Sequence, residues 1–92
     1  MNKPNAFAQR LIQGDTAIRE NFGIEVLSAD AGHSELALVV TDAWVNAAGF
    51  THGSVAYAMM DSACAYACGS LDVLGLTTSG NVTYVRGSQA GA

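Results

Sequence analysis

Basic residues are scarce in this sequence, and their absence narrows the partners that the protein is expected to bind. The four basic side chains stand against eight acidic ones and leave a net charge of −4. They are Lys3, Arg10, Arg19 and Arg86. Because they are scattered along the chain rather than clustered, neither nucleic acid nor an anionic membrane surface is expected as a partner.

Cysteine is also rare, and its spacing argues against a metal centre. Cys64 and Cys68 are four residues apart, which on a helix makes them stacked neighbours that resemble small buried hydrophobes in a reducing compartment. No C-x-x-C or H-x-x-x-H spacing is present to recruit His33 or His52, so no metal site is predicted. The first residues contain no apolar run followed by a cleavage site, and a cytoplasmic protein is expected.

The length of the chain allows one domain at most. With 92 residues and 50% hydrophobic content, residues 1–92 are expected to form a single small core that is marginal alone and would gain from a partner subunit. The sequence contains no internal repeat and no low-complexity tract that would suggest another architecture.

The first half of the chain predicts a helix followed by a hairpin. Residues 5–22 fit one amphipathic helix that Asn5 can cap and Gly23 can end. Residues 24–41 read as a β-hairpin with one apolar face, because alternating apolar positions flank the turn chemistry of residues 30–32. A polar, glycine-containing loop should then lead to the next helix.

The dominant feature is a long apolar helix, predicted over residues 53–68, that carries one charge, Asp61. The length of this segment is close to that of a membrane span, but it is rich in Ala, Gly and Ser, and Asp61 at mid-span would cost about 2.5–3.5 kcal/mol. A core helix is therefore favoured. Within a core, Asp61 is either a structural carboxylate bonded to Ser62 or Tyr57, or a functional one.

Residues 76–86 are rich in β-branched and aromatic side chains and are predicted to form a third strand. The resulting order is helix, strand, strand, long helix, strand. This order predicts an α+β fold in which one antiparallel sheet wraps the long helix, which would explain why that helix is apolar on so many faces.

The motif Asn46, His52-Gly53 and Asp61 in an alanine-rich helix resembles the hotdog-fold acyl-CoA thioesterases, and within them the PaaI-like enzymes of phenylacetic acid degradation. The resemblance covers residues 5–86. It implies a hotdog-like fold and hydrolysis of small or aromatic acyl-CoA thioesters, with coenzyme A entering as part of the substrate and no further cofactor. It also implies a homodimer or a dimer of dimers.

The sequence departs from the family pattern in three places. Ser54 replaces the second glycine of the turn, and Arg86-Gly87 lacks the proline that usually follows the arginine. Family members continue with further strands that complete the sheet, so an incomplete sheet is expected here. Two alternatives to an active thioesterase therefore stay open: a non-catalytic acyl-CoA-binding or assembly module, and an inactive fragment of an enzyme.

Thioester hydrolysis needs a group that activates water or attacks the carbonyl, together with donors for the oxyanion. Asp61 is the candidate base or nucleophile, and an apolar surround is expected to raise its pKa. The backbone N–H of Gly53, at the positive end of the helix dipole, and the side-chain amide of Asn46 are the candidate donors. His52 is expected to position the turn or the substrate.

Two further residues complete the predicted site. Thr77, favoured over Thr78, matches the position where relatives carry a hydroxyl near the acid, and it is expected to help place water. Arg86 is assigned to the coenzyme A phosphates, with a solvated strand end as the simpler reading.

The spacing between Gly53 and Asp61 constrains the site. Eight residues on one helix correspond to about 12 Å at 1.5 Å per residue, too far for both to act on one carbonyl. If both are used, Asp61 of one chain must meet Gly53 and Asn46 of another, as antiparallel central helices in a two-fold dimer allow.

Overall fold

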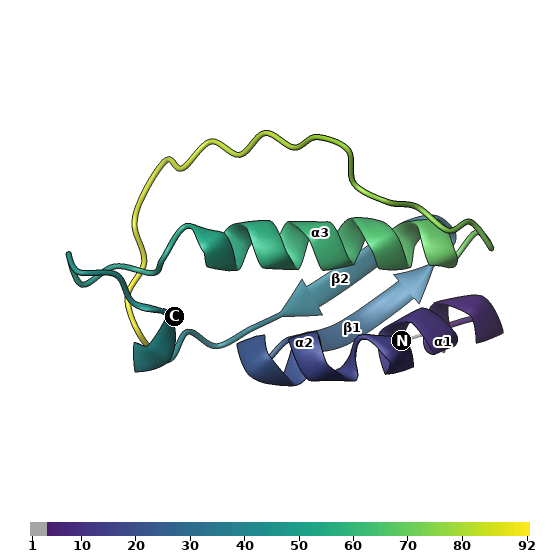
Figure 1. Cartoon of the computed structure of the whole chain (residues 1–92), viewed down its shortest axis with the longest axis horizontal. Coiled ribbons are helices and arrows are strands. Elements are labelled where there is room, and N and C mark those ends of the chain that lie inside the picture. Colours follow the sequence, from purple (N-terminus) through teal and green to yellow (C-terminus); the bar gives the residue numbers. More distant parts are fainter. Residues whose placement is uncertain (1–3) are drawn as a thin grey trace.

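The computed structural model describes residues 4–92 and has the predicted α+β character (Figure 1). A hairpin and two short helices lie against a long helix, and an extended segment returns along the far side of that helix. The elements are α1 (Ala6–Gly14), α2 (Thr16–Phe22), β1 (Glu25–Asp30), β2 (His33–Ala37), the 3₁₀ turn η1 (Asp42–Trp44) and α3 (Ser54–Gly69).

The N-terminal region forms two helices, and the prediction of one continuous helix over residues 5–22 was wrong. Asn5 caps α1 as expected, because its Oδ1 accepts the N–H of Ala8 at 2.8 Å. The break follows Gly14, a poor helix former, and falls at Asp15, whose carboxylate accepts a hydrogen bond from the hydroxyl of Tyr66 at 2.8 Å. This tertiary contact draws Asp15 toward α3 and fixes the junction.

The predicted hairpin is confirmed. Strands β1 and β2 pair antiparallel around the two-residue turn of Ala31 and Gly32, whose φ angles are both positive, at 51° and 79°. Such angles match the tight turns that follow the natural twist of a hairpin. Strand β2 ends at Ala37 and is shorter than the predicted run to Thr41.

The core lies where α1 and the hairpin meet α3. Its fully buried members are Ala8, Ala29 and Tyr66. Helix α1 approaches the end of α3 closely, because a Cβ added to Gly69 would stand 2.7 Å from Cδ1 of Leu11. A larger residue at this position would push the Leu11 side chain aside, so Gly69 favours the close packing of α1 on α3.

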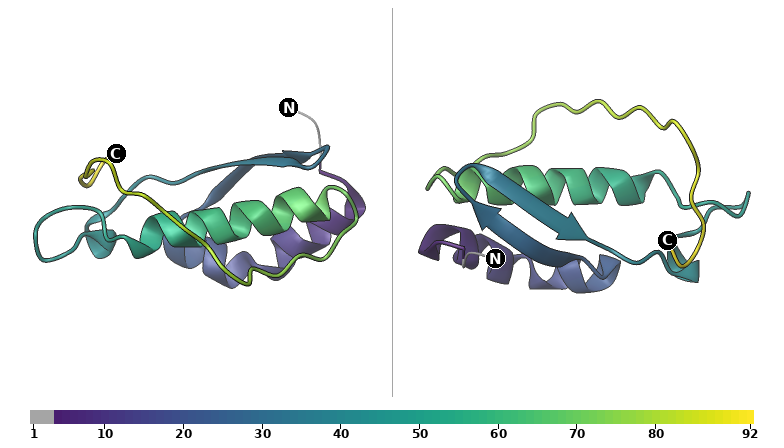
Figure 2. Two further views of the ribbon diagram at one scale, coloured as in Figure 1. Left: turned by 90° about the horizontal axis from the view of Figure 1, so that it is seen from above. Right: turned by 180° about the vertical axis from the view of Figure 1, so that it is seen from behind.

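The third predicted strand is not present in the described structure. Residues 76–86 run extended along the side of α3 opposite α1 and α2 (Figures 1 and 2). Among residues 4–92, however, no backbone hydrogen bond joins this segment to another strand. Its β-branched composition favours the extended conformation, but a strand also needs a neighbour that satisfies its backbone groups. The described sheet therefore has two strands, and it covers α3 incompletely.

The incomplete cover leaves one side of α3 open. Ala56, Tyr57, Asp61 and Cys64 are all exposed, whereas Val55, Tyr66 and Gly69 are buried. Within the part of the chain that the structure describes, no helix is both long enough and apolar enough to cross a membrane.

Candidate active site

The loop before α3 is held in a fixed shape by its own backbone. An isolated antiparallel bridge joins Val45 to Thr51, and the N–H of His52 donates to the carbonyl of Trp44 at 2.7 Å. Oδ1 of Asn46 accepts the N–H groups of Ala48 and Phe50 at 3.0 and 3.1 Å. The loop thus closes on itself and delivers Asn46 and His52 to the start of α3.

An aromatic stack ties this loop to the N-terminal helices. The rings of Phe22, at the end of α2, and Trp44, in η1, lie 4.5 Å apart between centroids with 13° between their planes. Because the carbonyl of Trp44 accepts the N–H of His52, the stack supports the backbone that leads directly into the candidate site.

His52 has a defined proton arrangement. Its Nδ1 accepts the N–H of Ser54 at 3.1 Å and lies 2.7 Å from the Ser54 hydroxyl. An N–H can only donate, so Nδ1 is the acceptor in this geometry, which fits the tautomer that has its N–H at Nε2. His52 therefore keeps a free N–H donor while its other nitrogen supports the helix start.

Gly53 is the N-cap residue of α3, directly before Ser54. Its carbonyl accepts a hydrogen bond from the hydroxyl of Tyr84 at 2.7 Å. Within residues 4–92, its own N–H has no hydrogen-bond acceptor. The unpaired donor sits at the positive end of the helix, as the sequence predicted.

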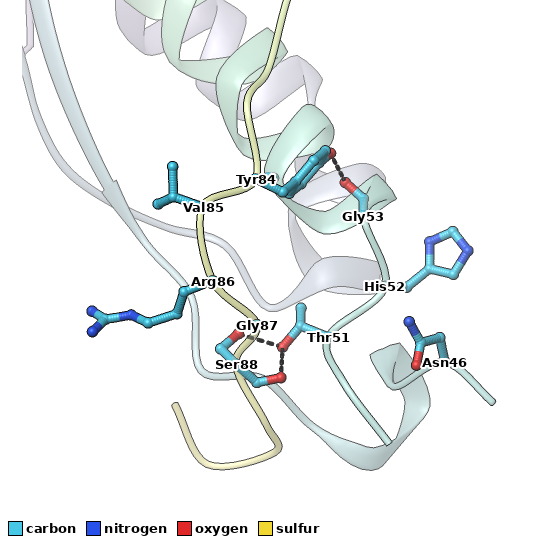
Figure 3. A pocket seen from close by; sticks show the side chains of 10 residues that line it. Asn46, Thr51, His52, Gly53, Tyr84, Val85, Arg86, Gly87 and Ser88 are labelled. Atoms are coloured by element: carbon cyan, nitrogen blue, oxygen red, sulfur yellow. Dashed lines mark hydrogen bonds between the residues drawn. The ribbon is translucent and has the colours of Figure 1, made fainter. Parts of the chain in front are cut away.

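A hollow of about 500 Å³ brings most of the predicted site residues together (Figure 3). Asn46 and His52 lie on one side of it, with the nitrogen of the Asn46 amide turned toward the imidazole, and the side chain of Arg86 extends away from both. The lining residues are Asn46, Thr51, His52, Gly53, Ala56, Tyr84, Val85, Arg86, Gly87 and Ser88.

Asp61 and Thr77 lie in a second hollow of about 380 Å³, which shares no lining residue with the first. The hydroxyl of Thr77 donates to Oδ1 of Asp61, and Thr78 lines the same hollow without this bond. The favoured threonine is thus the one in contact with the carboxylate. The sequence also offered Ser62 and Tyr57 as partners of Asp61. In the structure, the hydrogen bond to the Asp61 carboxylate comes from Thr77.

The expectation that Asp61 is buried was wrong for the single chain, in which Asp61 is exposed. The sheet that would cover it on this side of α3 is not part of the described structure. Asp61 and Gly53 belong to separate hollows along one helix, so the structure brings together two groups, Asn46 with His52 and Gly53, and Asp61 with Thr77.

Sequence reasoning missed Tyr84, Thr51 and Ser88. Thr51 and Ser88 face one another with their hydroxyls 2.6 Å apart, and the N–H of Thr51 donates to the carbonyl of Ser88 at 2.8 Å. These contacts join segments more than thirty positions apart, as does the bond from Tyr84 to Gly53. Alternation in residues 76–86 signals an extended segment, but it does not reveal which helix end that segment meets.

Within residues 4–92, no three His, Cys, Asp or Glu side chains lie close enough together to hold a metal ion. Cys64 and Cys68 are free thiols.

Comparison with known proteins supports the assignment that the motif suggested. No protein-family model matches the chain. The acyl-coenzyme A thioesterase PaaI of Escherichia coli K12 is 28% identical over 75 residues, which make up 82% of this chain and 54% of PaaI. The chain thus spans about half the length of this relative.

Solved structures agree in fold. The E. coli PaaI protein of the phenylacetic acid degradation operon superposes with a TM-score of 0.81 at 25% identity, over 91% of this chain and 64% of that one. A conserved protein of Pseudomonas aeruginosa gives 0.75 at 27% identity, over 82% and 62%. A phenylacetic acid degradation-related protein of Ralstonia eutropha JMP134 gives 0.67 at 26% identity, over 92% and 70%. In sequence and in fold, the chain is therefore a PaaI-like, hotdog-fold relative of the acyl-CoA thioesterases.

Proposed function

We propose that the protein hydrolyses the thioester bond of small or aromatic acyl-CoA substrates. One observation carries the proposal: three residues that line the hollow at the start of α3 each have an N–H donor without an acceptor among residues 4–92. They are the N–H of Gly53, the Nε2–H of His52 and the Nδ2 amide of Asn46. Each of these three residues uses another polar atom in a hydrogen bond within the fold. Donors collected in this way suit a developing oxyanion.

The carboxylate of Asp61 supplies the second requirement. In the proposed reaction, Asp61 takes a proton from water while the water oxygen bonds to the thioester carbon, and the oxyanion forms against the donors at Gly53 and Asn46. When the carbonyl reforms, the C–S bond breaks and the thiolate leaves with its electron pair. Asp61 then gives its proton to the thiolate, which restores the carboxylate and yields a carboxylic acid and coenzyme A. Direct attack by Asp61, followed by hydrolysis of the acyl-enzyme, gives the same products.

Supporting residues have defined places in this proposal. The Thr77 hydroxyl, bonded to Asp61, orients the carboxylate and its water. Arg86 lines the hollow that contains Asn46, His52 and Gly53, which we call the donor hollow. Its guanidinium extends away from Asn46 and His52, where the phosphates of coenzyme A would enter. The bound substrate brings coenzyme A itself, so the proposal needs no separate cofactor.

The proposal also requires two chains. Asp61 lies about 12 Å along α3 from Gly53, a distance taken from the helical rise per residue. A homodimer, or a dimer of such dimers, that pairs the exposed side of α3 in antiparallel fashion would bring Asp61 of one chain to Gly53 of the other. Free cysteines on α3 fit a reducing compartment, and we propose a cytoplasmic location.

The test is hydrolysis of a panel of acyl-CoAs by the purified chain and by its Asp61→Asn variant. We expect the variant to lose at least about 100-fold in kcat, in line with the loss of a general base. Equal turnover by both proteins would remove Asp61 from the mechanism. Saturable binding of acyl-CoA without hydrolysis by the unaltered protein would favour the alternative of a binding or assembly module.

A mixing experiment tests the shared site. Asp61→Asn and Asn46→Ala proteins, each inactive alone, are unfolded together and refolded at equal concentration. Half of the dimers formed at random carry both variants, and one of their two sites is intact, so about one quarter of the original activity should return. Mixed dimers that are folded but inactive would contradict a site built from two chains.

A further inference from the structure

Tyr84, which lies outside the predicted motif, contacts the backbone of Gly53. Its hydroxyl donates to the Gly53 carbonyl at 2.7 Å, and its ring lines the donor hollow together with Asn46 and His52 (Figure 3). The bond joins the extended segment to the N-cap residue of α3, 31 positions earlier in the chain.

The peptide group between Gly53 and Ser54 is held at both ends. Tyr84 binds its carbonyl oxygen, and Nδ1 of His52 accepts its N–H at 3.1 Å. A peptide group is planar, so two such bonds fix its rotation as a unit. The Gly53 N–H belongs to the preceding peptide group, which meets this one at the Cα of Gly53 and whose carbonyl, that of His52, accepts the N–H of Val55 at 3.1 Å. With both peptide groups held, the direction of the Gly53 N–H is restricted.

The same contact explains why the position suits glycine. A Cβ added to Gly53 would stand 3.3 Å from the Tyr84 hydroxyl oxygen and 3.5 Å from the ring carbon that bears it. Its φ and ψ, −59° and −25°, are open to any residue, so the backbone conformation itself does not demand glycine. The close approach of Tyr84 is what restricts the space.

We infer that Tyr84 is a positioning residue for the proposed hydrolysis: by holding the 53–54 peptide, it aims the free N–H of Gly53 into the hollow. This inference depends on the proposed function for its kinetic consequence. Oxyanion stabilisation depends on donors that are oriented before the charge develops, so a donor that turns freely contributes less. Tyr84 itself does not touch the reacting atoms.

The test is Tyr84→Phe, which removes the hydroxyl and keeps the ring. We expect kcat to fall about tenfold while KM stays unchanged, because an interaction with the transition state is weakened and substrate binding is not. The matched control is Tyr66→Phe, which likewise removes one hydroxyl and one hydrogen bond, but at the junction with Asp15. That control should lower stability and leave kcat unchanged.

Amide hydrogen exchange of Ser54, followed by NMR, tests the positioning without reference to activity, because the Ser54 N–H is bonded to Nδ1 of His52. Exchange at this amide should accelerate in Tyr84→Phe and stay unchanged in Tyr66→Phe. Unaltered exchange in Tyr84→Phe, an unaltered kcat, or a rise in KM alone would overturn the inference. If the unaltered protein hydrolyses no acyl-CoA, the proposed function fails by itself, and the exchange measurement still decides the role of Tyr84.

Discussion

At the scale of single residues, the site candidates divide their polar atoms between folding and chemistry. Asn46 uses Oδ1 to close its loop, His52 uses Nδ1 to support Ser54, and Gly53 uses its carbonyl to receive Tyr84. In each case an N–H donor is left without an acceptor in the part of the chain that the structure describes. Tyr66 is the contrasting case, because its side chain is fully buried and its hydroxyl is committed to Asp15. This residue serves the fold alone.

Tyr66 gives a prediction about stability at alkaline pH. Burial, together with the hydrogen bond to the negatively charged Asp15, raises the pKa of Tyr66 well above its usual value of about 10. Its stabilising contribution is therefore complete below pH 10, where both folded and unfolded chains hold the proton, and it declines as the pH rises above 10 and only the unfolded chain releases it. We expect the melting temperature to fall above pH 10.

The comparison that isolates this effect is Tyr66→Phe, measured by thermal unfolding between pH 7 and 11. At neutral pH the variant should be less stable by about 1 kcal/mol, the usual value of one hydrogen bond. Its melting temperature should then fall less steeply above pH 10 than that of the unaltered protein. Parallel curves for the two proteins would contradict the assignment to Tyr66.

At the scale of elements, the sequence predicted the features that depend on residues close together in the chain. The Asn5 cap, the turn at residues 31–32 and the long apolar helix all follow from such signals, and all are present. The missing third strand and the break at Asp15 depend on partners distant in the sequence: a neighbouring strand in one case and Tyr66 in the other. Likewise, the motif identified Gly53 and Asp61, whereas the contact of Tyr84 with Gly53 required the fold.

The link between α2 and the site loop is open to a direct test. Phe22→Leu removes the stack on Trp44, an interaction worth about 0.5–1.5 kcal/mol beyond burial, and should loosen the loop that carries Asn46 and His52. We expect a lower kcat and a changed emission spectrum from Trp44, the single tryptophan of the chain. Steady-state kinetics and fluorescence measure the two effects.

Phe7→Leu is the matched control for this substitution, because Phe7 lies in α1 against Gly69 and away from Trp44. It should lower stability and leave both the emission spectrum and kcat close to their original values. An equal loss of kcat in the two variants would mean that general destabilisation, and not the position of the loop, is responsible.

At the scale of the whole molecule, the described chain leaves much apolar surface uncovered. One side of α3 is open, and large hydrophobic side chains of the following segment are also exposed, among them Leu71, Leu74, Leu76 and Val85. A domain of this size with so small a core is marginal alone, so association should contribute to its stability. Association and activity then become coupled if each site takes Asp61 from one chain and Gly53 from another.

This coupling predicts that activity depends on concentration. On dilution below the dissociation constant of the dimer, hydrolysis per chain should fall and the melting temperature should decrease, because folding and association are linked. Sedimentation at matched concentrations would report the fraction of dimer. Asp61→Asn should associate as the unaltered protein does, since its carboxylate is not needed for packing. Constant activity per chain, in samples that sediment as monomers, would show that one chain suffices and would refute the two-chain site.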